Sequence, residues 1–327
     1  MNFILSEMTF LRYFIPLAIE GHKRGLKSTM HWMAGGKYNC PLTHYRNLES
    51  LSKEYNFELC RIDEPIEGEG PTFMIEGVGR AHSKTKQKVS LTCNIDYYAL
   101  YDRYKDEVDH MIFPSKYFAL QKIPFQGKIS TFDSPKIKYL GSPKYDIKID
   151  TLKVKKKFNL KDKDKHALII LPKMRDVGLV NFDAILAFLK KLNYKIITKN
   201  RGKENFNFKG GDINITDEYW YPHPTMDLIK MCDLVINFDS LSIKECVMLR
   251  TKVINFHIKP YPQRVPDLYL GDYCQNIEVK DYTAEDLVRR HSVLEKATDD
   301  SFQENIDRFM FQPNSSKRIL DFLNCSG

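Results

Sequence analysis

The chain has no paired arrangement of cysteines. Its seven cysteines are scattered, their number is odd, and none forms a Cys-x-x-Cys pair. Disulfide frameworks and zinc knuckles require regular sulfur spacings, so neither is expected. We therefore expect reduced thiols and a cytoplasmic protein.

Long hydrophobic runs are also missing. The longest apolar stretch, 10–19, is interrupted by Arg12 and contains Pro16. It is shorter than the ~18 residues that a membrane-spanning helix requires. Residues 1–6 have neither a basic start nor a cleavage site for export. We expect no integral membrane segment.

Several catalytic motifs are absent. The sequence has no Gly-x-x-x-x-Gly-Lys-Ser/Thr, no Gly-x-Ser-x-Gly and no His-Glu-x-x-His, which excludes the common P-loop, hydrolase and metalloprotease patterns. Asp162-Lys-Asp164 matches a metal-binding Asp-x-Asp, but it lies in a lysine-rich segment. We assign it no role.

What is present is the composition of an ordinary globular protein with a modest basic excess. A length of 327 residues corresponds to two domains at ~150 residues each. The net charge of +8 suits an anionic partner such as a nucleotide or a nucleic acid. A basic solvated surface explains the same charge equally well.

Apolar segments alternate between strand and helix spacing along most of the chain, which predicts parallel α/β sheets. Eight lysines and three aspartates crowd residues 148–165, and this segment is predicted to be a basic linker. The predicted organisation is an acceptor-binding domain over 1–147, the linker, a nucleotide-sugar-binding domain over 166–300, and C-terminal helices over 301–327 that pack back on the first domain.

Two such domains predict an α/β protein with two Rossmann-like domains facing across a cleft. Ligands of open α/β sheets sit beyond the carboxyl ends of the strands. A cleft between two such edges can hold two substrates and exclude water when it closes.

Residues 225–256 read as helix, strand, hydroxyl-bearing turn, helix and strand. Ser240 and Ser242 fall where the second helix starts, and a helix start favours phosphate. Glu245 lies one turn further, where a carboxylate can accept both hydroxyls of a ribose. The alternative is a plain N-cap at Asp239 or Ser240 with a solvated Glu245.

The pattern DLVINFDSLSIKE followed by KVINF resembles the donor-binding half of GT-B glycosyltransferases. It is similar to the UDP-GlcNAc 2-epimerases and the CDP-glycerol glycerophosphotransferases, although Leu241 and Ser242 replace two glycines of the epimerases. Segments 139–146, 109–118 and 313–319 resemble further stretches of the glycerophosphotransferases. The resemblance implies a nucleoside-diphosphate sugar as co-substrate, with a UDP-sugar expected, and no obligatory metal or other cofactor.

The resemblance also implies which loops contact the donor. Lys173 and Arg175 follow the first strand of the second domain and can neutralise a diphosphate leaving group. His223 belongs to the aromatic, proline-rich segment 220–224, which can pack on the base. Solvated basic residues and a rigid core turn are the structural alternatives for these two segments.

On the acceptor side, Glu76 directly follows a strand and precedes Gly77, where the glycerophosphotransferases carry His-Gly. A carboxylate can serve there as the general base. Asp96, His82 and His31 are further candidates, for which a structural role is the alternative.

The sequence thus predicts a metal-independent glycosyltransferase that moves a sugar from a nucleoside-diphosphate sugar to an acceptor hydroxyl. An anionic acceptor fits the charge, and one such acceptor is DNA carrying hydroxymethylated bases, which phage-type DNA glycosyltransferases flip out of the helix. The composition, rich in Lys, Asn, Ile and Phe, is consistent with an AT-rich genome and with this acceptor. A surface glycan is an equal alternative. Rival functions are glycerophosphotransferase, nucleotide-sugar epimerase, and a non-catalytic nucleotide- or nucleic-acid-binding protein.

Overall fold

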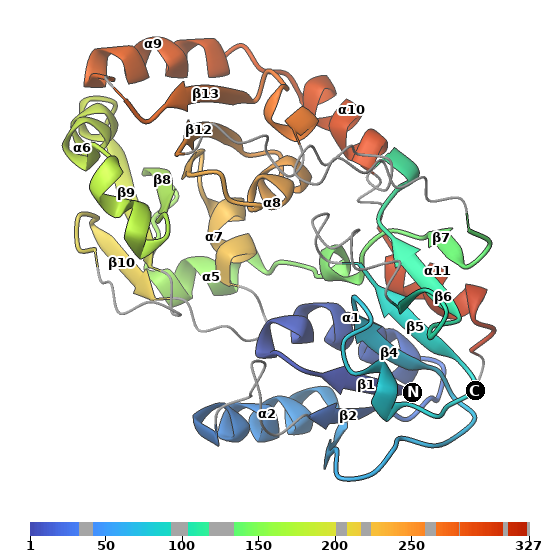
Figure 1. Ribbon diagram of the computed structural model, residues 1–327. Helices are drawn as coiled ribbons and strands as arrows, with labels where there is room; N and C mark the ends of the chain where they lie inside the picture. Colours follow the sequence, from blue (N-terminus) through green and yellow to red (C-terminus); the bar gives the residue numbers. More distant parts are fainter. Residues whose placement is uncertain are drawn as a thin grey trace. The chain divides into compact units, whose positions relative to one another are not determined.

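The computed structural model describes residues 1–32, 42–92, 104–117, 134–200, 208–216, 224–258, 266–280, 282–309 and 313–325. The chain divides into two units, each built on its own parallel sheet (Figure 1). The first unit contains Met1–Ile147 and Arg308–Gly327. The second contains Lys148–Glu218 and His223–Asp307.

The first sheet has the strand order β3-β2-β1-β4-β5-β6-β7, and every pairing within it is parallel. Strand order therefore reverses between β1 and β4, which is the topological switch point where open α/β sheets bind ligands. The strands are β1 (Asn2–Leu5), β2 (Thr29–Trp32), β3 (Glu58–Arg61), β4 (Thr72–Ile75), β5 (Lys88–Leu91), β6 (His110–Phe113) and β7 (Ile137–Tyr139).

The core of the first unit is aromatic. Phe3 stacks on Phe73 and contacts Phe14 of α1 (Leu11–His22), with ring centroids 5.3 Å apart in both pairs. Helix α2 (Leu42–Tyr55) connects β2 and β3. This packing buries one face of the central strands against α1, as a parallel sheet requires.

The last helix, α11 (Ser315–Phe322), belongs to the same unit and packs on α1. Its start is capped from a distant turn, because Asp146 accepts hydrogen bonds from the backbone N–H groups of Ser315 (2.9 Å) and Ser316 (2.6 Å). Two segments that carried the resemblance to glycerophosphotransferases, 139–146 and 313–319, therefore meet through this carboxylate.

The second sheet has the order β10-β9-β8-β11-β12-β13, again with only parallel pairings, and its switch point lies between β8 and β11. The predicted fold class, α/β with two Rossmann-like domains, is confirmed. The strands are β8 (Lys165–Ile170), β9 (Tyr194–Asn200), β10 (Ile213–Thr216), β11 (Leu234–Asn237), β12 (Lys252–His257) and β13 (Cys274–Glu278).

Helices of the second unit cover this sheet, and α6 packs against α9 beside its core. Phe188, Leu234 and Phe256 are fully buried there. The helices are α5 (Thr151–Phe158), α6 (Phe182–Lys191), α7 (Pro224–Met231), α8 (Ile243–Met248), α9 (Ala284–Leu294) and α10 (Asp299–Phe309).

The segment predicted as a basic linker contains helix α5, which packs on α7 of the second unit. Asp150 caps it by accepting from the N–H groups of Leu152 (3.1 Å) and Lys153 (3.0 Å), and Asn159 ends it with a left-handed φ of 53°. Val154 and Leu160 are buried. Lysine is a good helix former, so two caps and two apolar contacts suffice where the charge pattern alone indicated a linker.

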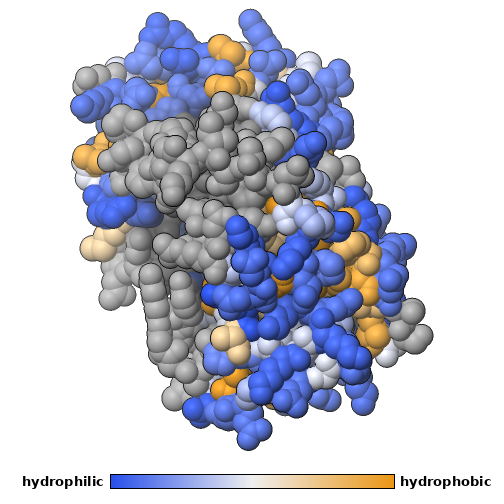
Figure 2. Space-filling view, turned by 45° about the vertical axis from the view of Figure 1, so that its right-hand side comes forward, coloured by the Kyte–Doolittle hydropathy of each residue, from blue (hydrophilic) through white to orange (hydrophobic). Residues whose placement is uncertain are grey.

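The face shown in Figure 2 is mostly hydrophilic where its residues are described. No helix among the described residues is both long and apolar enough to cross a membrane. The cysteines in the described ranges, at 60, 232, 246, 274 and 325, are free thiols.

Candidate functional site

The candidate donor site lies at the carboxyl edge of the second sheet, beyond β8 and β11. Two loops leave the sheet on either side of the switch point: 171–173 after β8 and 238–242 after β11. Parallel strands place both loops at the same edge, and ligands of this fold class bind there. Both loops carry residues that the sequence predicted to contact the donor.

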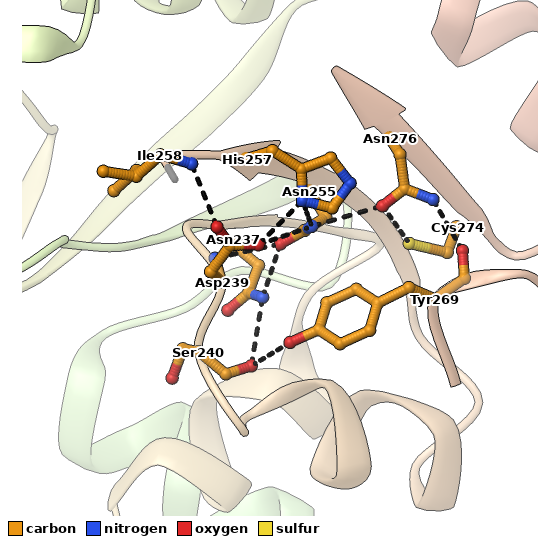
Figure 3. Close-up of polar contacts among 9 residues, drawn as sticks. All are labelled: Asn237, Asp239, Ser240, Asn255, His257, Ile258, Tyr269, Cys274 and Asn276. Atoms are coloured by element: carbon orange, nitrogen blue, oxygen red, sulfur yellow. Dashed lines mark hydrogen bonds and ion pairs between the residues drawn. The ribbon is translucent and has the colours of Figure 1, made fainter. Parts of the chain in front are cut away.

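The turn after β11 has an unusual backbone at Asp239, whose φ is 48°. Left-handed backbone is uncommon outside glycine, and aspartate tolerates it better than most residues. The carboxylate is held from two sides: Oδ1 lies 2.9 Å from Nδ1 of His257, and Oδ2 accepts from the N–H of Ile258 at 2.9 Å (Figure 3). Asp239 therefore ties the β11 turn to the end of β12.

Beneath this turn, three asparagines stand level on neighbouring strands. Asn237 pairs in register with Asn255, which pairs with Asn276. Nδ2 of Asn237 donates to Oδ1 of Asn255 (2.9 Å), and Nδ2 of Asn255 donates to Oδ1 of Asn276 (3.2 Å). The ladder is visible in Figure 3. It places a row of fixed amide dipoles across these three strands.

The ladder also fixes the turn that contains Ser240 and Ser242, which we call the serine turn. The carbonyl of Ser240 accepts from Nδ2 of Asn237 (3.1 Å) and from the hydroxyl of Tyr269 (2.9 Å). The hydroxyls of Ser240 and Ser242 lie 3.1 Å apart, so the structure brings the two predicted serines together. The Oγ of Ser240 also accepts from the N–H of Ser242 at 3.3 Å, which caps this turn from within.

Glu245 lies in the first turn of α8 and is only 5% exposed. A solvated Glu245, the alternative considered from sequence, is therefore wrong. A buried carboxylate requires partners, so Glu245 is held by its protein surroundings and not by solvent.

Lys173 and Arg175 both lie in the exposed loop after β8, which continues into the 3-10 turn Met174–Leu179. Nε of Arg175 is 3.7 Å from Oδ1 of Asp176, and the arginine side chain is 63% exposed. A contact of this length, made by a largely exposed arginine, holds the guanidinium weakly. Arg175 can therefore move to an arriving anion at little cost.

Sequence reasoning missed the role of His257. Its hydrogen bond to Asp239 raises the pKa of the imidazole above its ordinary value, against the opposing effect of burial. His257, Asn276 and Tyr282 line a cavity of about 510 Å³ within the second unit. Lys280, Arg289 and Arg290 also line it, together with the carboxylates of Glu278 and Asp286.

The acceptor-side candidates fall on the first unit. Glu76 directly follows β4, is 7% exposed, and has a φ of 51°. His82 ends a short 3-10 turn (Arg80–His82) and is partly buried. His31 bonds to Oδ1 of Asn2 at 2.9 Å and has a pKa lowered by burial, which favours the structural role. Asp96 and His223 lie outside the described residues.

Within the described ranges, no group of three or more His, Cys, Asp or Glu side chains is arranged to hold a metal ion.

Comparison with solved structures identifies the fold. The UDP-GlcNAc 2-epimerase of Neisseria meningitidis, solved with UDP-GlcNAc, matches with a TM-score of 0.65 over 99% of this chain and 98% of its own, at 12% identity. A variant of the wall teichoic acid polymerase TagF, soaked with CDPG, matches with a TM-score of 0.63 over 99% and 87%, at 13% identity. The fold is that of the GT-B proteins.

The GT-B likeness extends to a third kind of protein, the glycotransferase of kitacinnamycin, with a TM-score of 0.59 over 99% of this chain and 97% of that chain, at 9% identity. No protein-family model matches the sequence. No curated protein matches it either. At these identities the likeness concerns the fold alone.

Proposed function

We propose that this protein is a glycosyltransferase that moves a sugar from a nucleoside-diphosphate sugar to an acceptor hydroxyl. The observation that carries the proposal is the serine turn between Asp239 and Glu245, fixed at the switch point of a GT-B sheet. The fold is shared with proteins solved with UDP-GlcNAc and with CDPG, which supports a nucleotide-linked donor.

In this proposal the donor is held by side chains from both loops of the second unit. The hydroxyls of Ser240 and Ser242 donate to the diphosphate, and Glu245 accepts from the ribose hydroxyls. Lys173 and Arg175 offset the charge that grows on the departing diphosphate. His223 is proposed to contact the base.

The acceptor hydroxyl attacks the anomeric carbon of the sugar, and the bond from that carbon to the diphosphate oxygen breaks. The acceptor proton passes to Glu76, with His82 and Asp96 as alternative bases, and the nucleoside diphosphate leaves. Cationic side chains and helix dipoles can stabilise this leaving group. We therefore propose that the reaction needs no metal.

Two rivals share the fold: a glycerophosphotransferase and a nucleotide-sugar epimerase. Incubation with UDP-sugars and with CDP-glycerol, followed by product analysis, separates them. Transfer from a UDP-sugar to a glycan or to hydroxymethylated DNA supports the proposal. A UDP-sugar epimer, or transfer from CDP-glycerol alone, contradicts it.

A non-catalytic nucleotide-binding protein would bind these donors without releasing products. Calorimetric titration with UDP, comparing the wild type with Glu245→Ala, tests the donor site itself. We expect the variant to lose about 1–3 kcal/mol of binding free energy, because the ribose hydroxyls lose their acceptor. Equal affinity would remove Glu245 from the site.

A further inference from the structure

Three polar residues stand level at the carboxyl edge of the first sheet. Asn2 of β1 pairs with Thr72 of β4, and the same register, continued past the strand ends, brings Ser6 level with Glu76. Ile75 pairs with Leu91 of β5, so Glu76 is in turn level with Thr92. The row Ser6–Glu76–Thr92 therefore spans the switch point of this sheet.

Both outer members of the row carry buried hydroxyls without partners. Ser6 is 1% exposed and Thr92 is 6% exposed, and among the described residues neither hydroxyl has a hydrogen-bond partner. Buried hydroxyls are normally bonded, as at Thr85, whose Oγ1 contacts Thr72 (2.9 Å) and Ser83 (2.9 Å) in the same unit. Two unbonded hydroxyls that flank the same residue can each form a hydrogen bond with a ligand.

The middle of the row is strained. Glu76 adopts a φ of 51° in a position where glycine would be the ordinary choice. The turn is held by the N–H of Gly77, which donates to Oγ of Ser90 at 3.0 Å. A Cβ at Gly77 would lie 2.6 Å from the ring of Tyr104, so only glycine fits there. Strain of this kind is maintained where the conformation serves a site.

The charges around the row favour a neutral, hydroxyl-rich ligand over an anion. Glu76 lies in the row, and Glu7 follows Ser6 directly. Arg12 lies in the first turn of α1, and its buried Nε has no partner among the described residues. Two carboxylates outnumber the one guanidinium and oppose a phosphate, whereas sugar hydroxyls can donate to carboxylates and exchange hydrogen bonds with serine and threonine.

We propose that this row binds a carbohydrate acceptor, with the hydroxyls of Ser6 and Thr92 as its positioning contacts on either side of Glu76. This inference rests on the proposed function and names the acceptor class of the same reaction. Ser6 and Thr92 are two strand spacings, ~10 Å, apart. One sugar ring with a hydrogen bond on each side can bridge that distance.

The first test is stability without ligand. Thr92→Val replaces an unbonded hydroxyl by a methyl group of the same shape, so we expect its thermal midpoint to rise or stay equal to that of the wild type. Thr85→Val removes a hydroxyl that is fully bonded, and its midpoint should fall. A fall at Thr92 as large as that at Thr85 would show that Thr92 already has an internal partner, and would overturn the proposal.

The second test is binding, measured by NMR titration of the full chain with glucose, N-acetylglucosamine, glycerol and glycerol 3-phosphate. We expect a neutral sugar to bind, and the double variant Ser6→Ala/Thr92→Val to lose about two- to tenfold in affinity per hydrogen bond removed. Ser28→Ala is the matched control, since Ser28 is 2% exposed with an unbonded hydroxyl but precedes β2 at the opposite edge.

Ser28→Ala should bind the sugar as the wild type does. Equal binding by the double variant, binding of glycerol 3-phosphate alone, or no binding of any neutral sugar each overturns the inference. Transfer from a UDP-sugar with unchanged kinetics in the double variant would overturn the inference while the proposed function stands. If the double variant loses sugar binding but the wild type transfers no sugar, the proposed function is overturned and the binding site stands.

Discussion

At the scale of single residues, the contact between Asp239 and His257 makes the second unit sensitive to pH. The pKa of His257 is raised in the folded protein, chiefly by its hydrogen bond to Asp239. Its contribution to stability is therefore fully present below the unfolded pKa of ~6.5, and it disappears as pH rises through the raised folded value. Asp239→Asn should remove this dependence, because asparagine tolerates left-handed backbone but carries no charge.

The effect is measured by urea unfolding of the wild type and of Asp239→Asn, once below the unfolded pKa of histidine and once above the raised pKa of His257. We expect the stability difference between the two proteins to be larger at the lower pH. His291, whose pKa is lowered by burial, serves as a control, because its replacement by Gln should change stability in the opposite sense as pH falls. A difference that does not vary with pH would mean that His257 stays neutral when folded.

The proposed base is tested by Glu76→Gln, which keeps the shape of the side chain and removes its proton acceptor. We expect turnover to fall by about 10²–10⁴-fold, the usual contribution of a general base. UDP affinity should change little, because the donor residues lie on the other unit. His82→Gln and Asp96→Asn are the comparison variants, and retention of most activity by Glu76→Gln would move the role to one of them.

The contribution of Arg175 to substrate binding can be separated from its contribution to catalysis. If its guanidinium offsets charge that develops as the diphosphate departs, Arg175→Ala should lower kcat more than it raises KM. Its contact with Asp176 is long, at 3.7 Å, and the arginine side chain is mostly exposed, so the fold should tolerate the change. Steady-state kinetics measures both constants, and a change confined to KM would limit Arg175 to substrate binding.

At the scale of elements, apolar spacing predicted most strands well. The apolar spacing predicts strands over 72–75, 110–113 and 234–237, and these are the bounds of β4, β6 and β11 in the structure. Strand β13 was not predicted, because an edge strand with only partial burial, Cys-Gln-Asn-Ile-Glu, lacks the apolar run of a central strand. The same spacing predicts a helix over 177–192, but α6 begins only at Phe182, after a 3-10 turn.

The asparagine ladder shows what a closer reading of the sequence could have found. The sequence Val-Ile-Asn-Phe occurs twice, at 235–238 over the end of β11 and at 253–256 within β12. When two neighbouring parallel strands carry the same sequence in the same register, identical residues lie side by side. The repeat therefore predicts the pairing of Asn237 with Asn255. The contact of Asp239 with His257 depends on a left-handed turn, which no local pattern indicates.

The cap of α11 by Asp146 should contribute measurably to the first unit. Removing a capping carboxylate costs about 0.5–2 kcal/mol, and here two backbone N–H groups lose their acceptor. Asp146→Ala should therefore lower the free energy of unfolding in that range, and Asp146→Asn should lose less because it keeps one acceptor oxygen. Asp150→Ala, which removes the cap of α5 in the second unit, is the matched comparison.

For the whole molecule, alternating strand and helix patterns were enough to predict two Rossmann-like domains. The rule that ligands bind beyond the carboxyl ends of parallel strands then directed attention to Ser240 and Glu76. That both follow strands bordering a switch point is known only from the strand order in the structure. Which polar groups would be left unbonded could not be predicted, because Ser6 and Thr92 are far apart in sequence and their lack of partners appears only when the chain is folded.

The division into two units predicts which part of the chain a bound nucleotide stabilises. A donor that binds only the folded second unit stabilises it by mass action, by about 2.7 kcal/mol at a hundredfold excess over Kd. Amide hydrogen exchange with and without UDP should therefore slow in β8, β11 and α8, while β1, β4 and β5 exchange at unchanged rates. Glu245→Ala should need more UDP for the same protection. Equal protection of both units would contradict a donor site confined to the second unit, and protection of the first unit alone would transfer the nucleotide to the row Ser6–Glu76–Thr92.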